Sequence, residues 1–224
     1  NAQYIEENGS FRWRIVLEMP ALAEQIASPC DPDARYGKKR DVSWVGYKTH
    51  LTETCDPDMP YVITNVETTP AATPDDHMLA VVHQSLAKTE LLPSEHLVDM
   101  GYTGCHMLVD SQQQHGVTIV GPVVDNSSWQ AHTEGGLTKA QFLVDWDRQV
   151  VTCPAGKQSI SWLPSTYPKS GMQFEARFAR QDCAACPMRS RYTWSKVEPR
   201  IITLQARDHY EALASARHRQ MSEE

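Results

Sequence analysis

The chain has 224 residues, of which 41% are hydrophobic, enough to bury a core and too many for a disordered protein. It has no apolar run near the roughly 18 residues of a membrane span and no basic-then-apolar start typical of a secretory signal, so we expect a cytoplasmic protein without a membrane partner. The net charge of −7 argues against a protein that simply coats nucleic acid.

Charge is distributed unevenly along the chain. Residues 49–110 hold ten Asp or Glu and one Lys, whereas residues 176–219 hold nine Arg or Lys and four Asp or Glu. A second basic stretch lies at Arg35–Arg40. An acidic centre between basic flanks is typical of a metal-dependent enzyme that acts on a polyanion, although the solvated faces of an ordinary protein give the same pattern.

Residues 1–27 predict a hairpin followed by a short helix. Asn8-Gly9 supplies the positive φ angles of a tight turn between two runs of β-forming residues, and Pro20–Ala27 has the pattern of a short helix. The chain opens at Asn1 without an initiator methionine and stops at Glu224 inside a helical pattern. We therefore expect an interior fragment of a longer protein.

Residues 28–124 predict a core with the order strand, strand, helix, strand. Trp44–Cys55 alternates large apolar and polar residues, and it forms a hairpin with the second strand, Tyr61–Thr69. An amphipathic helix is expected from Pro74 to Leu91, capped by Thr73, and His96–Met100 is the next strand. A right-handed crossover would place this strand in one sheet with Tyr61–Thr69, and the helix would pack across both.

Asp99 lies at the end of the His96–Met100 strand, just before Gly101, which can turn the chain. A carboxylate at the tip of a buried strand is where α/β folds place chemistry. In a ribonuclease-H-like core, such carboxylates come from separate strands and a later helix, and they hold two Mg²⁺ ions for phosphodiester cleavage or transfer. A single Asp at a strand end is also common as a helix cap or a turn residue, so the spacing alone leaves both roles open.

The second half of the chain predicts a β insertion. A helix at Gly104–His115 and a strand at Val117–Val120 complete the first part, and residues 125–206 follow as an inserted, mostly β module. Helix returns at residues 207–224, where we expect the start of a C-terminal catalytic helical region. The expected fold class is α/β in the α+β sense, with an incomplete ribonuclease-H-like core and an inserted β module.

Four stretches have a distinctive order of residues: Ser28–Arg40, Trp44–Cys55, Thr64–Asp76 and Leu92–Tyr102. Together they resemble the DDE transposases of bacterial insertion sequences, in the branch that carries a β insertion, and the resemblance extends over nearly the whole chain. It implies an Asp, Asp, Glu triad that binds two Mg²⁺ ions for DNA cleavage and strand transfer in transposition. It also implies transposon ends as the DNA partner and is compatible with a homo-oligomer of the full-length protein.

Asp99 matches the second Asp of that triad. The other two members are not identifiable, because Asp31 and Asp33 lie in a proline-flanked loop, and Glu223 and Glu224 lack the surroundings expected of the final Glu. A lone carboxylate binds Mg²⁺ poorly, so we expect the fragment to be inactive by itself.

Without a secretory signal, the six cysteines are expected to be thiols or metal ligands rather than disulfides. Cys183 and Cys186 have the spacing of a metal knuckle. The resemblance adds Cys153, in a Cys-Pro-x-Gly turn, and places Tyr192 where relatives carry a fourth Cys. We expect the three sulfurs to converge, either around Zn²⁺ with a water or histidine as fourth ligand, or as free thiols of a site that has lost a ligand.

Several other side chains are candidates for ligand binding. Basic residues clustered beside the core hairpin are the best candidates for DNA phosphate contacts; they are Lys38, Lys39, Arg40 and Lys48. Histidines that could help a metal or a phosphate are His50, His77, His132 and His209. Tryptophans that could stack on bases, or fill a β core just as readily, are Trp44, Trp129, Trp146, Trp162 and Trp194.

The alternative function is a non-catalytic zinc- or nucleic-acid-binding module. In that case Asp99 is structural, and the region of Cys153, Cys183 and Cys186 carries the function. Mutation of Asp99 and of the cysteines in the full-length protein distinguishes the two hypotheses, because only the cysteines matter in the second.

Overall fold

The computed structural model describes residues 3–21, 24–58, 60–167 and 171–222. It contains helices and several small sheets, so the predicted α+β class is confirmed. The chain divides into two compact units: unit 1 comprises residues 1–96 and 115–117, and unit 2 comprises residues 97–114 and 118–224. Among the helices in the described ranges, none has both the length and the apolar character that a membrane crossing requires.

Unit 1 opens with the predicted hairpin. β1 (Tyr4–Glu7) and β2 (Ser10–Trp13) pair in an antiparallel register. Asn8 and Gly9 both have positive φ, 53° and 77°, as the tight turn requires. The helix expected over residues 20–27 is not formed by those residues of the range that the structure describes.

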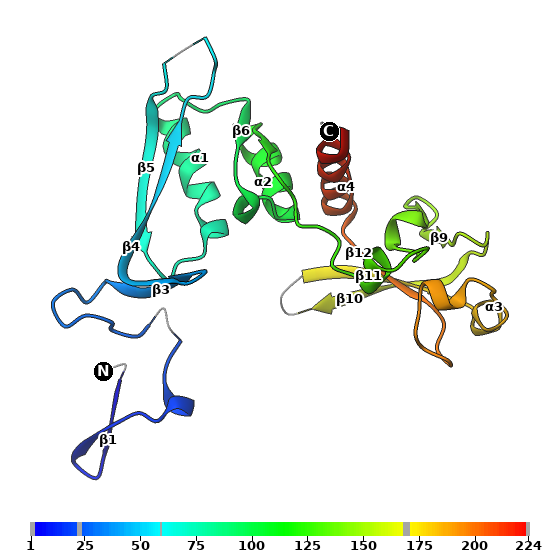
Figure 1. Ribbon diagram of the computed structural model, residues 1–224, viewed down its shortest axis with the longest axis horizontal. Helices are drawn as coiled ribbons and strands as arrows, with labels where there is room; N and C mark the ends of the chain where they lie inside the picture. The colour runs from blue at the N-terminus through cyan, green and yellow to red at the C-terminus, as the bar shows by residue number, and fades with distance from the viewer. Residues whose placement is uncertain (1–2, 22–23, 59, 168–170, 223–224) are drawn as a thin grey trace. The chain divides into compact units, whose positions relative to one another are not determined.

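A three-stranded antiparallel sheet forms the body of unit 1. Its strands are β3 (Arg35–Lys39), β4 (Val42–Glu53) and β5 (Ile63–Pro70), in the order β3-β4-β5. The long β4–β5 hairpin is visible in Figure 1 and confirms the two strands predicted there. The alternating pattern of large apolar and polar residues was therefore a correct guide to this hairpin.

The two faces of β4 differ in their exposure. Trp44, Lys48 and His50 lie on a half-buried face. The other face carries exposed apolar side chains among polar ones: Val45 is 50% exposed and Leu51 61%, and Thr49 lies between them. The register continues these apolar side chains onto both neighbouring strands, since Tyr36 lies opposite Val45 and Val66 lies opposite Leu51. Exposed apolar side chains of three strands therefore share one face of the sheet.

The helix α1 (Leu79–Lys88) lies beside β5 (Figure 1). Its buried side chains are Leu79, Val82, His83 and Leu86. It begins later than predicted, after a 3-10 turn, η2 (Asp75–His77). Lys48 contacts this turn, since its ammonium group donates to the Thr73 carbonyl and pairs with the Asp75 carboxylate.

The strand before Asp99 is β6 (Glu95–Leu97), and it pairs with β7 (Thr118–Val120). The prediction that it shares a sheet with the Tyr61–Thr69 strand is therefore wrong. β6 has only three residues and finds its partner after one intervening helix, α2 (Cys105–His115). As predicted, Gly116 ends that helix with a positive φ of 69°.

The chain segment that follows β6 stays in close backbone contact with the end of β7 and the residues after it, within unit 2. The Val98 amide donates to the Val120 carbonyl at 2.9 Å. The chain then passes so near that a Cβ on Gly121 would lie 2.3 Å from the Val98 carbonyl oxygen. The buried Thr103 hydroxyl donates to the Pro122 carbonyl at 2.7 Å. This approach requires a glycine, and it sets the position of the segment that carries Asp99.

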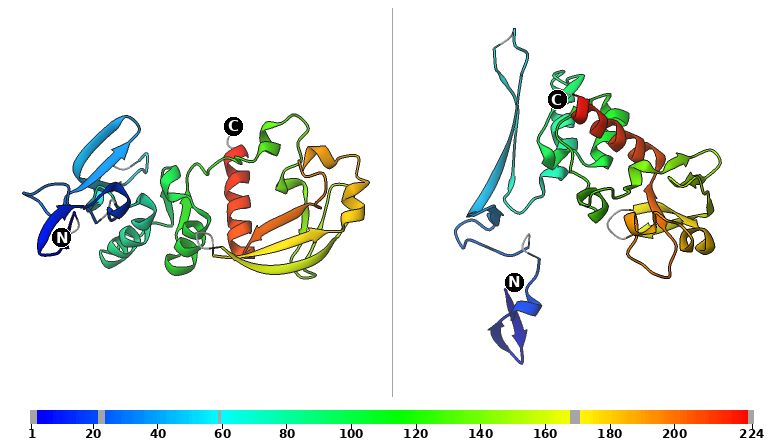
Figure 2. Two further views of the ribbon diagram at one scale, coloured as in Figure 1. Left: turned by 90° about the horizontal axis from the view of Figure 1, so that it is seen from below. Right: turned by 45° about the vertical axis from the view of Figure 1, so that its right-hand side comes forward.

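The segment expected to be mostly β contains two sheets (Figure 2). Its strands are β8 (Leu143–Asp145), β9 (Val150–Thr152), β10 (Ser159–Tyr167), β11 (Gly171–Phe178) and β12 (Ile201–Gln205). β8 pairs with β9, and β10, β11 and β12 lie side by side. Two 3-10 helices precede β8, η4 (Trp129–His132) and η5 (Lys139–Gln141), and two short helices lie between β11 and β12, α3 (Arg180–Ala184) and η6 (Arg189–Arg191). Their shared core is formed by Phe142, Val151, Ala176, Phe178, Cys183, Ile202 and Leu204.

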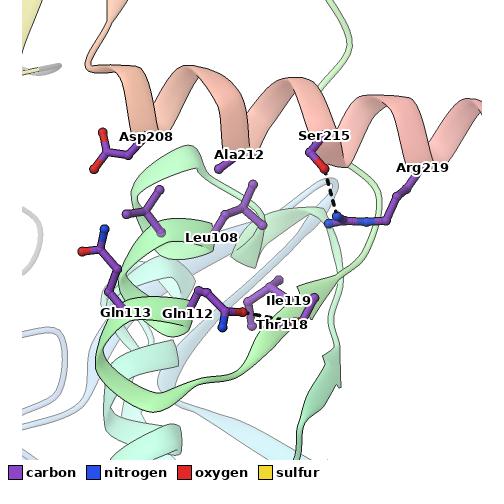
Figure 3. Close-up of a pocket in the computed structure, with 10 residues that line it drawn as sticks. Leu108, Gln112, Gln113, Thr118, Ile119, Asp208, Ala212, Ser215 and Arg219 are labelled. Atoms are coloured by element: carbon purple, nitrogen blue, oxygen red, sulfur yellow. Dashed lines mark hydrogen bonds between the residues drawn. The ribbon is translucent and has the colours of Figure 1, made fainter.

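The last helix, α4 (Arg207–Ser222), follows β12 and lies against α2 and β7 within unit 2 (Figure 3). A cavity of about 230 Å³ lies between them, and the residues drawn on its α4 side are Asp208, Ala212, Ser215 and Arg219. Two hydrogen bonds attach the helix to the chain after β7: Val123 N donates to Gln220 Oε1 at 3.0 Å, and Arg217 donates to the Val124 carbonyl at 3.2 Å. The Asp99 segment and α4 are thereby linked through β7.

We expect Gly121→Ala to lower the free energy of unfolding of unit 2 by about 1–3 kcal/mol, because the new Cβ would collide with the Val98 backbone. Gly104→Ala is the matched control, since a Cβ there meets mainly the flexible ends of the Met107 and His106 side chains. Urea unfolding monitored by circular dichroism measures both variants. Equal stability of the Gly121 and Gly104 variants would contradict the contact.

Candidate functional site

Asp99 lies two residues after β6 rather than inside a strand that runs to Met100, and β6 is not the buried strand that was expected, since Leu97 is 59% exposed. Its exposed side chain caps a 3-10 helix, η3 (Met100–Tyr102), with Oδ1 accepting a hydrogen bond from the Gly101 amide at 2.8 Å. This is the capping role that the sequence left open, and it uses one carboxylate oxygen. Within the described part of the chain the second oxygen accepts no hydrogen bond, so the cap leaves it open to a further ligand.

The described residues do not complete a two-metal site around Asp99. Within them, no three His, Cys, Asp or Glu side chains are placed to share one metal ion. Glu223 and Glu224 lie outside the described residues. Two-metal catalysis needs several convergent carboxylates, so no catalytic step can be assigned to Asp99 in this chain alone.

Asp31, which lies in the loop before β3, has a structural role. Its carboxylate accepts hydrogen bonds from the backbone amides of Asp33 and Ala34 and from the Tyr47 hydroxyl, the last at 2.9 Å. The hydrogen bond from Tyr47 is the main cause that lowers the pKa of Asp31. These contacts use Asp31 to shape a turn of unit 1.

The three cysteines of the expected knuckle line one cavity of about 300 Å³ in unit 2. Cys183 is buried in α3, and Cys153 and Cys186 are half-buried in the turns after β9 and α3. The Cys153 turn is closed by a hydrogen bond from the Gly156 amide to the Cys153 carbonyl at 2.8 Å. As stated for Asp99, no three possible ligands in the described ranges are placed around one ion, so these thiols do not form a preassembled zinc site.

Tyr192 lines the same cavity, at the position where the resemblance implies a fourth cysteine. Its ring is buried, with 6% exposure. Burial, followed by hydrogen bonding with the thiols of Cys186 and Cys183, raises the pKa of its hydroxyl well above its ordinary value. The phenol therefore stays neutral and interacts with two of the three sulfurs. Among the described residues that line the cavity, neither His132 nor His209 appears as a substitute ligand.

The candidate DNA contacts fall into two groups. Lys38, Lys39 and Arg40 are exposed at the β3–β4 turn, where Arg40 has a positive φ of 55°. Lys48 is half-buried and bound to Asp75 and to the Thr73 carbonyl. The turn can offer its three charges to a phosphate backbone, whereas Lys48 would first have to break its ion pair.

A histidine cluster in unit 1 was not among the predicted site residues. His83 of α1 is fully buried, and its Nε2 lies 3.0 Å from His96 Nδ1. The ring of His115 meets that of His83 edge to face, with centroids 5.4 Å apart. Two ring nitrogens, His83 Nδ1 and His115 Nε2, are buried without a hydrogen-bond partner. The only signal in the sequence was a histidine at a core position of an amphipathic helix, next to Val82.

Residues 152–224 match the family model described as Transposase DDE domain. This segment holds all three cysteines of the cavity, Tyr192 and α4, and it does not include Asp99. The match supports a relationship to DDE transposases for less than half of the chain, although the sequence resemblance extends further. No curated protein and no solved structure matches the chain.

The histidine cluster predicts a loss of stability in weak acid. Burial, with smaller contributions from His96 and His115, lowers the pKa of His83 from 6.5 to about 4. As the pH falls from about 6.5 to about 4, His83 is protonated in the unfolded chain but stays neutral in the folded chain, so the free energy of unfolding decreases. We expect His83→Leu to weaken this pH dependence in urea unfolding. His77→Leu, at an exposed position, should leave it unchanged, and equal slopes for both variants would refute the assignment.

Tyr192→Cys should increase the affinity of the chain for Zn²⁺ by more than about tenfold, because it replaces the phenol that interacts with two of the thiols and adds a fourth thiolate to the same cavity. Competition with a chromophoric chelator measures the affinity. The double variant Tyr192→Cys, Cys183→Ser is the control and should lose the gain. If Tyr192→Cys binds no more zinc than the native chain, the four side chains do not point at a common centre.

Proposed function

We propose that the chain is part of a DDE transposase, an enzyme that cuts transposon ends and joins them to target DNA. The observation that carries this proposal is the family match at residues 152–224, which covers the cysteine cavity and α4. Asp99 lies outside the match but in the same compact unit, unit 2. The proposed partner is DNA, and the proposed place of Asp99 is the second carboxylate of the triad.

The contacts of unit 2 support a ribonuclease-H-like arrangement for this region. Such a core brings a carboxylate at a strand end close to a later helix that carries another acid. Here Asp99 follows β6, β6 pairs with β7, and the Val123 amide after β7 donates to Gln220 near the end of α4. The later helix α4 is thus tied to the chain that pairs with the Asp99 segment, which supports the proposed arrangement.

The sheet of unit 1 supports the further proposal that the core is incomplete. Exposed apolar side chains on one face of its three strands include Tyr36, Val45, Tyr47, Leu51 and Val66, each at least 40% exposed. Exposed apolar surface of this kind often marks an interface or a missing partner. We propose that another part of a longer protein covers it, and that the first Asp of the triad comes from that part.

Mg²⁺ bound by the complete triad would activate water and then a DNA 3′-hydroxyl for attack on phosphates. The residues described here supply one candidate ligand, so the reaction is proposed for the complete protein. What this chain contributes is a fixed strand end: the Gly121–Val98 approach and the η3 cap hold Asp99 in place before any metal arrives.

We expect the purified chain, in Mg²⁺ or Mn²⁺, neither to cut nor to join DNA that carries the ends of its insertion sequence. In the complete protein, Asp99→Asn should lower cleavage by more than about 100-fold, since losing a metal-binding carboxylate costs more than losing a group that only orients a ligand. Asn can still accept the Gly101 hydrogen bond, so this substitution removes the charge and keeps the cap. Gel analysis of labelled ends measures both steps.

Asp110→Asn is the matched control for that experiment, because Asp110 is exposed on α2 of the same unit. Unchanged cleavage by the Asp99 variant, together with activity lost on substitution of the cysteines, would favour the non-catalytic zinc- or nucleic-acid-binding module. Cleavage by the isolated chain that disappears with Asp99→Asn would show that further ligands lie within it.

A further inference from the structure

The tryptophans of unit 2 fall into two pairs with different surroundings. Trp146 and Trp162 pack edge to face beside the β core, at a centroid distance of 5.5 Å. Trp129 and Trp194 are stacked instead, with centroids 4.7 Å apart and an interplanar angle of 20°. Trp194 is 74% exposed although its partner is half-buried. One pair therefore fills a core, while the other presents an indole to solvent.

Hydrogen bonds hold the exposed indole in a defined loop. The Arg189 guanidinium donates to the carbonyls of Ser195 and Glu198, at 2.9 and 3.0 Å from Nη2. The Ser195 hydroxyl accepts from the amides of Val197 and Glu198. A ligand that stacks on Trp194 would thus bind to a preformed surface, and little conformational entropy of the loop would be lost on binding.

Next to this indole lies an open hollow of about 560 Å³. Of the described residues that line it, two are basic, Arg189 and Lys196, and none is acidic. The hydroxyl residues Ser190 and Thr193 also face it. Lys196 takes part in none of the salt bridges found among the described residues, so its ammonium group is free to bind an anion. A flat aromatic ring beside positive charge and hydroxyl donors suits a ligand with a planar ring and an attached anion.

We propose that the Trp194 face binds an unpaired nucleotide of a DNA strand. The base stacks on the outer face of Trp194 and extends the Trp129–Trp194 stack, while a neighbouring phosphate lies against Lys196. A base in an intact duplex is already stacked on both sides, so the site selects single-stranded or frayed DNA. This proposal rests on the proposed function only for DNA as the partner, and it needs neither Asp99 nor a metal.

The test is binding of the purified chain to labelled oligothymidylate of about 12 nucleotides, within the length range of single-strand binding modules, measured by fluorescence anisotropy. Trp194→Ala should weaken binding roughly 5- to 150-fold, the usual effect of removing one stacked base contact, and Trp194→Phe should retain most of it. Lys196→Gln should reduce the salt dependence of binding. An abasic strand of equal length should bind weakly to the native chain and to Trp194→Ala alike.

Trp13→Ala is the matched control, since Trp13 is 63% exposed in the β1–β2 hairpin of unit 1 and its ring lies against that of Tyr4, tilted by 33°. The proposal is overturned if Trp194→Ala binds like the native chain, if the abasic strand binds equally well, or if no single strand binds at all. These outcomes are independent of the proposed catalytic role, which is judged from Asp99-dependent cleavage by the complete protein.

Discussion

The approach of Val98 to Gly121 is the contact on which the candidate site depends. The amide hydrogen bond from Val98 to Val120 pairs the two chain segments, and the absence of a side chain at Gly121 lets them come together. Asp99 directly follows Val98 in the chain. On the other segment, Val123 lies just after Gly121 and donates a hydrogen bond to Gln220 near the end of α4. A small backbone constraint therefore connects the candidate carboxylate with the helix of the segment that matches a transposase domain.

Local features of the fold were predictable because each depends on neighbouring residues. The turn at Asn8-Gly9, the end of α2 at Gly116 and the alternation along β4 all follow from intrinsic conformational preference. The partner of β6 was not predictable in this way, because it depends on which of several strands lies nearest in space. The start of α1 was not predictable either, since the turn before it contacts Lys48, which is far away in the sequence.

The sequence predicted which residue types form the candidate site, but not which side chains pack around them. Spacing and resemblance correctly predicted that Cys153, Cys183 and Cys186 lie close together, since all three line one cavity, but they did not predict that the buried Tyr192 phenol interacts with two of the thiols. Tryptophans are difficult to assign from sequence for a similar reason, because the same residue type is common both in buried cores and on ligand-binding surfaces. Only exposure and neighbours separate Trp162, packed beside the β core, from Trp194, which lies on the surface.

The proposal that ties these observations together is that Asp99 is a metal-binding carboxylate of a DNA transposase. Anomalous diffraction from crystals of the complete protein, bound to transposon-end DNA and Mn²⁺, tests it directly. We expect an anomalous peak about 2.1 Å from an Asp99 carboxylate oxygen, a distance typical of Mg²⁺–oxygen bonds. A metal held elsewhere, with Asp99 only capping η3 through Gly101, would contradict the claim.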